Sequence, residues 1–184
     1  MILDHNVPLR LRFKYFDTSI GPSILFAIAV LPMTKGRLQE LDKLQRKMLR
    51  RIVGWRRIEN EDWSITMKRM NDRLDQGQRL FYCEPWSIRF ARNQWRYIQH
   101  LIKAYPLLWA RILCKYNAYT SDDPESDFLP HRSPGHPRMR WDDHIHSFCH
   151  KVWPRLRERH WFDILCHLDL PSYEDEYVLH IANL

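Results

Sequence analysis

The sequence predicts an all-α protein, and three observations support this fold class. Apolar residues recur at steps of three and four along most of the 184 residues, and no segment alternates apolar and polar residues as a strand does. Proline occurs 11 times, mostly between the periodic segments, whereas glycine occurs only 5 times. The hydrophobic content of 45% argues against disorder. Together these features are typical of helices joined at proline-containing turns.

Two short helices are predicted at the N-terminus, over 9–19 and 21–31. We expect them to be separated at Gly21-Pro22 and the second to end at Pro32, because a proline ring cannot continue a helix interior. The apolar run 22–31 is about half the length that a membrane-spanning helix needs, so we interpret it as a buried helix.

A long basic amphipathic helix is predicted next, beginning after Thr34 and ending near Gly54. The Thr34 hydroxyl can accept a first-turn amide, and glycine commonly follows the last residue of a helix. Segment 35–57 has nine Lys or Arg and two Asp or Glu, a net charge of +7 that equals the charge of the whole chain. Such a helix is suited to pack on its own protein while its charged face meets a polyanion. Its predicted apolar stripe consists of Leu38, Leu41, Leu44 or Gln45, Met48, Ile52 and Trp55.

Three further helices are predicted in the central part of the chain. The first opens at Asn60 or Asp62 and runs to about Gln76, the second covers 87–103, and the third covers 106–116. The first has an apolar face formed by Trp63, Met67, Met70 and Leu74. The second is rich in Arg and aromatic residues, and we expect Trp86 and Trp95 to be used in core packing rather than in base stacking.

The periodic pattern stops between Asn117 and Arg138. An acidic stretch, 121–127, is followed by a stiff proline-rich stretch, 129–138. Two last helices are predicted over 140–151 and 155–168. The predicted organisation is therefore a helical region over 1–118, an acidic and then proline-rich connector over 119–139, and a C-terminal helical segment over 140–184.

The four cysteines are far apart in sequence and form no CxxC pair. No basic region followed by an apolar core precedes the first predicted helix, so we expect an intracellular protein with reduced, buried thiols. Met1 leads at once into a structured-looking stretch, which indicates that the chain begins inside a larger protein. The cysteines are Cys83, Cys114, Cys149 and Cys166.

The string Pro134-Gly-His-Pro-Arg-Met-Arg-Trp-Asp-Asp143 predicts a rigid basic loop that leads into a helix. Arg138 and Arg140 project from it, and arginine forks bind phosphate oxygens with two hydrogen bonds. A solvated turn is an equally good interpretation of this loop. We expect Trp141 to be a packing anchor and the two aspartates to complement the helix dipole.

No catalytic constellation is found. The pair Asp142-Asp143 lacks the third carboxylate that two-metal catalysis requires. His146 and His150 share a helical face and could bind a metal with His131, His136 or a distant acidic residue, but scattered surface histidines are the commoner case. The sequence contains no nucleophile elbow, P-loop or dinucleotide-binding motif. We therefore predict no metal, no cofactor and no catalytic residue.

Three strings occur in an order that resembles one family. They are Phe16-Asp-Thr-Ser-Ile-Gly-Pro-Ser-Ile-Leu-Phe26, Leu41-Asp-Lys-Leu-Gln-Arg-Lys-Met-Leu-Arg-Arg-Ile-Val-Gly-Trp55 and Gly135-His-Pro-Arg-Met-Arg-Trp-Asp-Asp143. Together they resemble the region C-terminal to the palm in reverse transcriptases of LINE-type (non-LTR) retrotransposons, over about residues 13–145. That family has an "LxxxQRRxLRxIxG" helix and a "G-R-P-x-x-R-W-x-D" string. His136 stands where the family has arginine, which removes one permanent charge.

The resemblance implies a thumb over 1–118 and a linker after it, from an RNA-directed DNA polymerase. Polymerisation needs a palm with a Phe/Tyr-x-Asp-Asp box, and target cleavage needs an endonuclease domain. The sequence contains neither, so we expect a non-enzymatic fragment, either a truncated element copy or a gene model that starts at an internal Met. Its partners would be the missing palm, in a longer chain, and RNA, DNA or RNA–DNA hybrid in the nucleus and cytoplasm. No membrane partner is expected.

The predicted nucleic-acid contacts are sequence-nonspecific and go to phosphates. The residues assigned to them are Lys43, Arg46, Lys47, Arg50, Arg51, Arg56, Arg57, Arg138 and Arg140. Two alternatives stay open. The chain could be a domesticated helical interaction module whose basic helix contacts an acidic partner or a membrane surface. It could also be a decayed fragment without function, with the apolar run 22–31 exposed.

Overall fold

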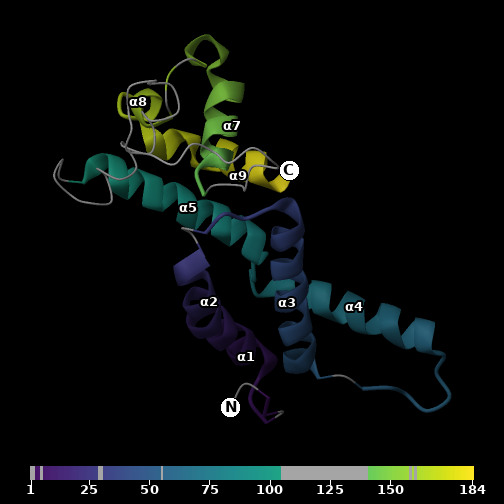
Figure 1. The fold of residues 1–184 in the computed structure, drawn as a ribbon. Coiled ribbons are helices and arrows are strands. Elements are labelled where there is room, and N and C mark those ends of the chain that lie inside the picture. Colours follow the sequence, from purple (N-terminus) through teal and green to yellow (C-terminus); the bar gives the residue numbers. More distant parts are fainter. Residues whose placement is uncertain are drawn as a thin grey trace. The chain divides into compact units, whose positions relative to one another are not determined.

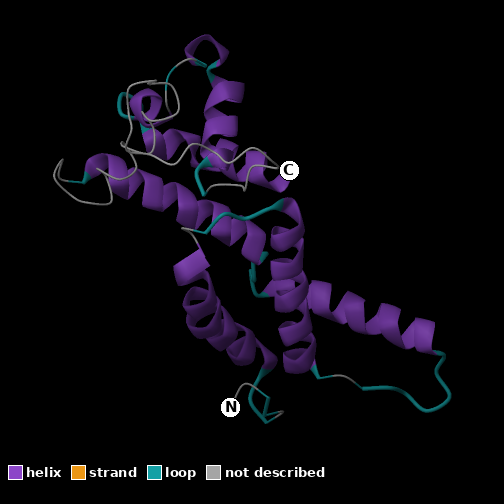
Figure 2. Ribbon diagram, viewed as in Figure 1, coloured by secondary structure: helices purple, strands orange, loops and turns teal. Residues whose placement is uncertain are grey.

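The computed structural model describes residues 3–4, 6–28, 31–54, 56–104, 141–157, 159 and 161–184. Every regular element in these ranges is a helix and none is a strand, which confirms the all-α prediction (Figure 2). The predicted helix at 106–116 and the connector lie outside the described residues.

The chain divides into two compact units. Unit 1 comprises Met1–Ile28 and Lys35–Phe90, and unit 2 comprises Ala29–Thr34 and Ala91–Leu184. The division falls inside helix α5, Trp86–Lys103, which contributes its first turn to unit 1 and the remainder to unit 2. The boundaries predicted at 118 and 139 lie among residues that are not described and stay a prediction.

Unit 1 begins with a continuous helical segment. It consists of α1 (Leu9–Tyr15), a π-helical turn (Phe16–Ile20) and α2 (Gly21–Ile28) (Figure 1). The predicted break at Gly21-Pro22 is wrong, because α2 begins at Gly21 directly after the π turn and includes both residues. Pro22 has no N–H to donate to the preceding turn. The carbonyl of Asp17 in this turn accepts a hydrogen bond from Arg89 Nη1 (3.3 Å) instead.

Gly21 lets the start of α5 approach this segment closely. A Cβ at this position would lie 3.0 Å from Arg89 Nη1 and 3.5 Å from Trp86 Nε1. The Trp86 indole stacks on Phe16, with ring centroids 5.6 Å apart. Within the predicted apolar run, Leu25 is buried and Phe26 is 87% exposed.

Helix α3, Lys35–Val53, begins directly after Thr34, and Gly54 follows it with φ 80°. These bounds confirm the predicted basic helix and its glycine stop. Leu38, Leu41 and Ile52 are buried as predicted. Of the two alternatives Leu44 and Gln45, the buried residue is Gln45, and the prediction of Met48 was wrong because Leu49 is buried in its place. Leu44 is 45% exposed and Met48 is half-buried, while Trp55 lies outside the described residues.

A buried arginine holds the C-terminal end of α3. Arg12 of α1 is 6% exposed, and its Nη1 donates to the Ile52 carbonyl. This carbonyl belongs to the last turn of α3, where no helical amide is present to bond it, and a positive charge there also complements the helix dipole.

Helix α4, Trp63–Leu80, continues past the predicted end at about Gln76. Gly77, inside this extension, faces Phe13, whose Cζ would lie 3.0 Å from a Cβ at this position. Asp62 caps the helix by accepting from the Ser64 amide (3.0 Å). Trp63 was predicted to lie on the apolar face but is 56% exposed, at the first position of α4. The buried face is Thr66, Met70, Leu74 and Gly77.

Two polar side chains of α3 hold the start of α5. Gln45 is 1% exposed; its Nε2 donates to the Glu84 carbonyl (2.8 Å) and its Oε1 accepts from the Trp86 amide (3.0 Å). Asp42 accepts from the amide (2.9 Å) and the hydroxyl (2.7 Å) of Ser87. The first amides of α5 have no partner within their own helix, so α3 supplies the acceptors that they need.

Unit 2 packs short helices on the remainder of α5. These are α7 (Asp143–Val152), a 3₁₀ turn (Pro154–Leu156), α8 (Trp161–Leu165), a second 3₁₀ turn (Leu170–Tyr173) and α9 (Glu174–Ala182). The predicted helix over 140–151 corresponds to α7. The single helix predicted over 155–168 is wrong, and α9 was not predicted. Four of the five α8 residues are buried, so this segment has no one-sided periodic stripe.

The core of unit 2 is an aromatic cluster. Trp95 stacks on Tyr177 (4.9 Å between centroids), and Phe148 packs edge-on against both rings. The buried Gln94 links this cluster to the start of α7, since its Nε2 donates to the Trp141 carbonyl (2.9 Å) and its Oε1 accepts from the Tyr177 hydroxyl (2.6 Å). Trp86 and Trp95 are both fully buried, which confirms their predicted use in core packing.

Trp141 is a packing anchor, as predicted, in edge-to-face contact with Tyr97 and Trp161. Asp142 does more than complement the helix dipole, because its Oδ2 accepts from the buried Trp161 indole (3.1 Å).

Cys83 and Cys149 are buried and reduced, and burial raises the pKa of each thiol to about 12. Among the described helices, none is long and apolar enough to cross a membrane.

The joint between α3 and α5 generates a stability prediction. Gln45→Leu would leave the Glu84 carbonyl and the Trp86 amide without their partner, and each unpaired buried group costs about 1–3 kcal/mol. We expect urea unfolding, followed by circular dichroism, to show a loss of about 2–4 kcal/mol. Gln39→Leu is the matched control, because Gln39 is exposed on the same helix. Equal stability of the two variants would contradict the assigned role of Gln45.

Candidate nucleic-acid interface

The net positive charge of the chain belongs to unit 1. Unit 1 contains 17 Lys or Arg and 10 Asp or Glu, a net charge of +7, whereas unit 2 contains 12 of each and is neutral. An anionic partner would therefore be attracted to unit 1.

Three of the predicted site residues form a line along α3. Lys43, Lys47 and Arg51 are exposed and are spaced by four residues, so they lie on one face of the helix, opposite the buried stripe. Consecutive members are separated by roughly 6 Å along the helix axis. Within the described part of the chain none of the three is in an ion pair. We call these three residues the basic ridge.

Arg46 and Arg50 are directed toward α4 instead. Arg46 Nη1 lies 2.9 Å from Asp75 Oδ1, and Arg50 Nη2 donates to Asn71 Oδ1 (3.1 Å). The second pair lies four residues later on α3 and four residues earlier on α4 than the first pair. The two helices therefore run antiparallel where these pairs meet, and we call this contact the seam between α3 and α4. The structure therefore divides the predicted residues of α3 into three that face solvent and two that bridge to α4.

Arg56 and Arg57 are exposed on the loop between α3 and α4, and hydrogen bonds hold this loop to α4. Glu61 accepts from Arg69 Nε (3.0 Å) and Nη2 (2.8 Å) and from the Thr66 hydroxyl (2.8 Å). Arg69 Nη2 also donates to the Arg56 carbonyl (2.9 Å). Arg57 Nη2 donates to the Glu61 carbonyl (3.3 Å). The loop thus presents two guanidinium groups from a fixed backbone.

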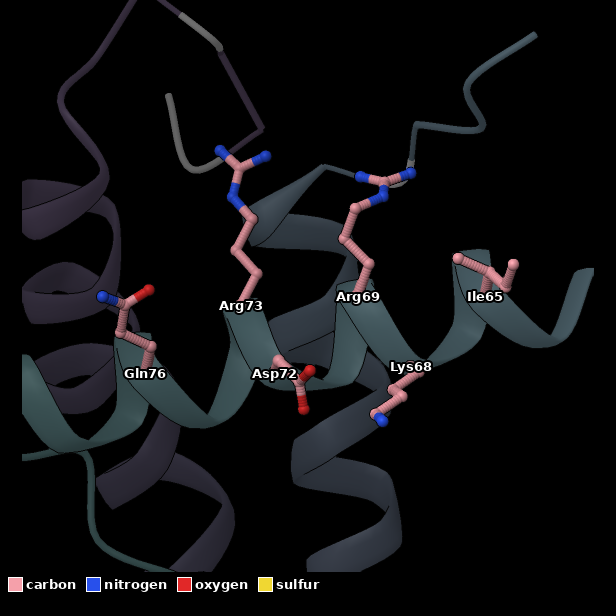
Figure 3. A pocket seen from close by; sticks show the side chains of 6 residues that line it. All are labelled: Ile65, Lys68, Arg69, Asp72, Arg73 and Gln76. Atoms are coloured by element: carbon pink, nitrogen blue, oxygen red, sulfur yellow. The ribbon is translucent and has the colours of Figure 1, made fainter. Parts of the chain in front are cut away.

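The outer side of α4 carries further basic residues that sequence reasoning missed. A shallow depression of about 430 Å³ is lined by residues of this helix alone, and Figure 3 shows Arg69 and Arg73 side by side, pointing away from α4 in the same direction. Arg69 and Arg73 are four residues apart and therefore share one face of the helix, and this spacing was visible in the sequence. Because a single helix forms the depression, it is an open surface rather than an enclosed site. Its lining residues are Ile65, Lys68, Arg69, Asp72, Arg73 and Gln76.

The remaining candidate residues belong to unit 2. Arg138 and Arg140 lie outside the described residues, so their phosphate contacts stay a prediction. The rings of His146 and His150 lie edge-to-face, 5.7 Å apart. Among the described residues, no group of three or more His, Cys, Asp or Glu could hold a metal ion.

Comparison with known proteins assigns no family. No protein-family model matches the chain, and no curated protein and no solved structure matches it. The resemblance to non-LTR reverse transcriptases therefore rests on the three sequence strings.

The Glu61–Arg69 pair generates a pH prediction. Hydrogen bonds from Arg69 and Thr66 lower the pKa of Glu61 from 4.5 to about 2. Because the folded-state pKa is depressed, the stabilisation is present above pH 4.5 and is lost as the pH falls toward 2. We expect wild type to be more stable than Glu61→Gln at pH 7, with a difference that shrinks below pH 4.5. Thermal unfolding of both proteins between pH 7 and pH 2 measures this difference in stability. A difference that does not change with pH would contradict the role of the Glu61–Arg69 pair.

Proposed function

We propose that the chain is the C-terminal thumb-and-linker region of a non-LTR reverse transcriptase and binds template–primer nucleic acid through phosphate contacts. The single observation that carries the proposed binding is the basic ridge, Lys43, Lys47 and Arg51, on the unit that holds the entire net charge. The assignment to a reverse transcriptase rests on the three sequence strings. Lysine and arginine side chains in a line can contact successive phosphates without reading the base sequence.

The burial of the apolar face of α3 favours a polyanion over an apolar partner. Basic amphipathic helices that bind membranes or enclosing protein grooves insert their apolar face. In α3 this face is already occupied, since Leu41, Leu49 and Ile52 are at most 7% exposed. The charged face is what the helix offers to a partner, and binding through such a face responds strongly to salt.

In this proposal the chain contributes binding and no chemistry. The polymerase reaction belongs to the palm of the parent protein, and none of the residues of this chain is assigned a catalytic role. The thumb-like region would hold the duplex by its backbone, and the loop residues Arg56 and Arg57 would extend the contact beyond the end of α3.

The salt dependence of binding tests this proposal. We expect Lys43→Gln/Lys47→Gln/Arg51→Gln to weaken binding of a fluorescein-labelled RNA–DNA hybrid. The slope of log K against log salt should become less negative by roughly 2–3, because each phosphate contact contributes about −0.9. Fluorescence anisotropy between about 50 and 200 mM salt measures the slope.

The matched control removes the same charge from unit 2. Arg155, Arg157 and Arg159 are exposed, and their triple replacement by Gln should leave the slope unchanged. Circular dichroism checks that both triple variants are folded. An unchanged slope in the ridge variant, or an equal change in the unit 2 variant, would contradict the proposed function.

A further inference from the structure

We infer that Asp75 of α4 restrains Arg46, and that a phosphate of the bound nucleic acid displaces Asp75 and recruits Arg46 as a contact beside the basic ridge. The inference rests on the proposed function and adds to it a residue that limits affinity. Asp75 would compete with the phosphate for the guanidinium group of Arg46. Arg46 would therefore contact a phosphate only when Asp75 is displaced, whereas the residues of the basic ridge are already exposed.

The Arg46–Asp75 pair is accessible to a competing anion. The side chains of Arg46 and Asp75 are 38% and 41% exposed, respectively, and their closest atoms are 2.9 Å apart. Exposed ion pairs contribute little to stability, because water and salt screen them. Phosphate is a strong partner for a guanidinium group, since it can accept two parallel hydrogen bonds from the fork. Replacement of the carboxylate by phosphate is therefore favourable at little cost to the fold.

The position of Arg46 on α3 suits this exchange. It follows Lys43 by three residues and precedes Lys47 by one, so it borders the basic ridge on the side of α4. A rotation of the side chain alone would bring its guanidinium to a phosphate held by Lys43 and Lys47.

Arg50 is the contrasting case on the same seam. Its Nη2 bonds a neutral acceptor, Asn71 Oδ1 (3.1 Å), and its Nε is buried and has no hydrogen-bond partner in the described part of the chain. A guanidinium inserted in this way is a structural link between α3 and α4. We therefore assign the exchange to Arg46 and not to Arg50.

The test compares two carboxylates of α4. In Asp75→Asn, the restraint on Arg46 is weakened while the side-chain shape is kept. We expect the slope of log K against log salt, measured with the same RNA–DNA hybrid, to become more negative by about 0.9, the value for one added phosphate contact. Binding at moderate salt should tighten by about two- to fivefold, which corresponds to the loss of one exposed ion pair.

Asp72→Asn is the matched control, because Asp72 is exposed on α4 and its replacement removes the same charge. Asp72 lines the depression on α4 and, among the described residues, does not bond α3. It should leave the slope at the wild-type value. Adding Arg46→Gln to Asp75→Asn should cancel the steeper slope. Circular dichroism checks that each variant is folded.

The outcomes separate this inference from the proposed function. An unchanged slope in Asp75→Asn, or an equal change in Asp72→Asn, would overturn the restraint while the ridge variant could still support nucleic-acid binding. An absence of salt-dependent binding by the wild-type chain would overturn both.

Discussion

The structure depends on the way in which α3 holds the start of α5. The first amides of α5 need acceptors from outside their own helix, and Asp42 and Gln45 supply them through the Ser87 and Trp86 amides. Gln45 also satisfies the Glu84 carbonyl. The same helix, α5, provides Gln94 and Trp95 to the core of unit 2. The first turn of α5 is thus held on α3, within unit 1, by two side chains that are three residues apart.

This constraint divides α3 into three faces. Residues that bury apolar surface or hold α5 face inward, Arg46 and Arg50 face α4, and the basic ridge faces solvent. Since the helical period is fixed, a helix that directs Asp42 and Gln45 toward α5 directs Lys43, Lys47 and Arg51 away from its buried stripe. The structural and the proposed binding roles of the helix are carried by different residues of one sequence string, so substitutions can separate them.

Sequence reasoning could predict the fold class and the bounds of the strongest elements, because these depend on local signals. The period of α3, the glycine after it and the proline before α5 are such signals. It could not choose between Leu44 and Gln45, since both positions fit steps of three and four. Gln45 is buried because its amide meets backbone groups 39 and 41 residues away, which no local pattern reveals.

The candidate site was predictable as a cluster and not as a surface. Composition alone places the charge in segment 35–57, but whether each cation is exposed depends on α4. Arg46 and Arg50 bridge to Asp75 and Asn71, and this register follows from helix packing. Lysine acetylation footprinting with and without an RNA–DNA hybrid tests the account most directly. Nucleic-acid binding through the basic ridge predicts that Lys43 and Lys47 become protected from acetylation, while the exposed Lys151 of unit 2 stays reactive. Unchanged reactivity of Lys43 and Lys47, or protection of Lys151 instead, would contradict it.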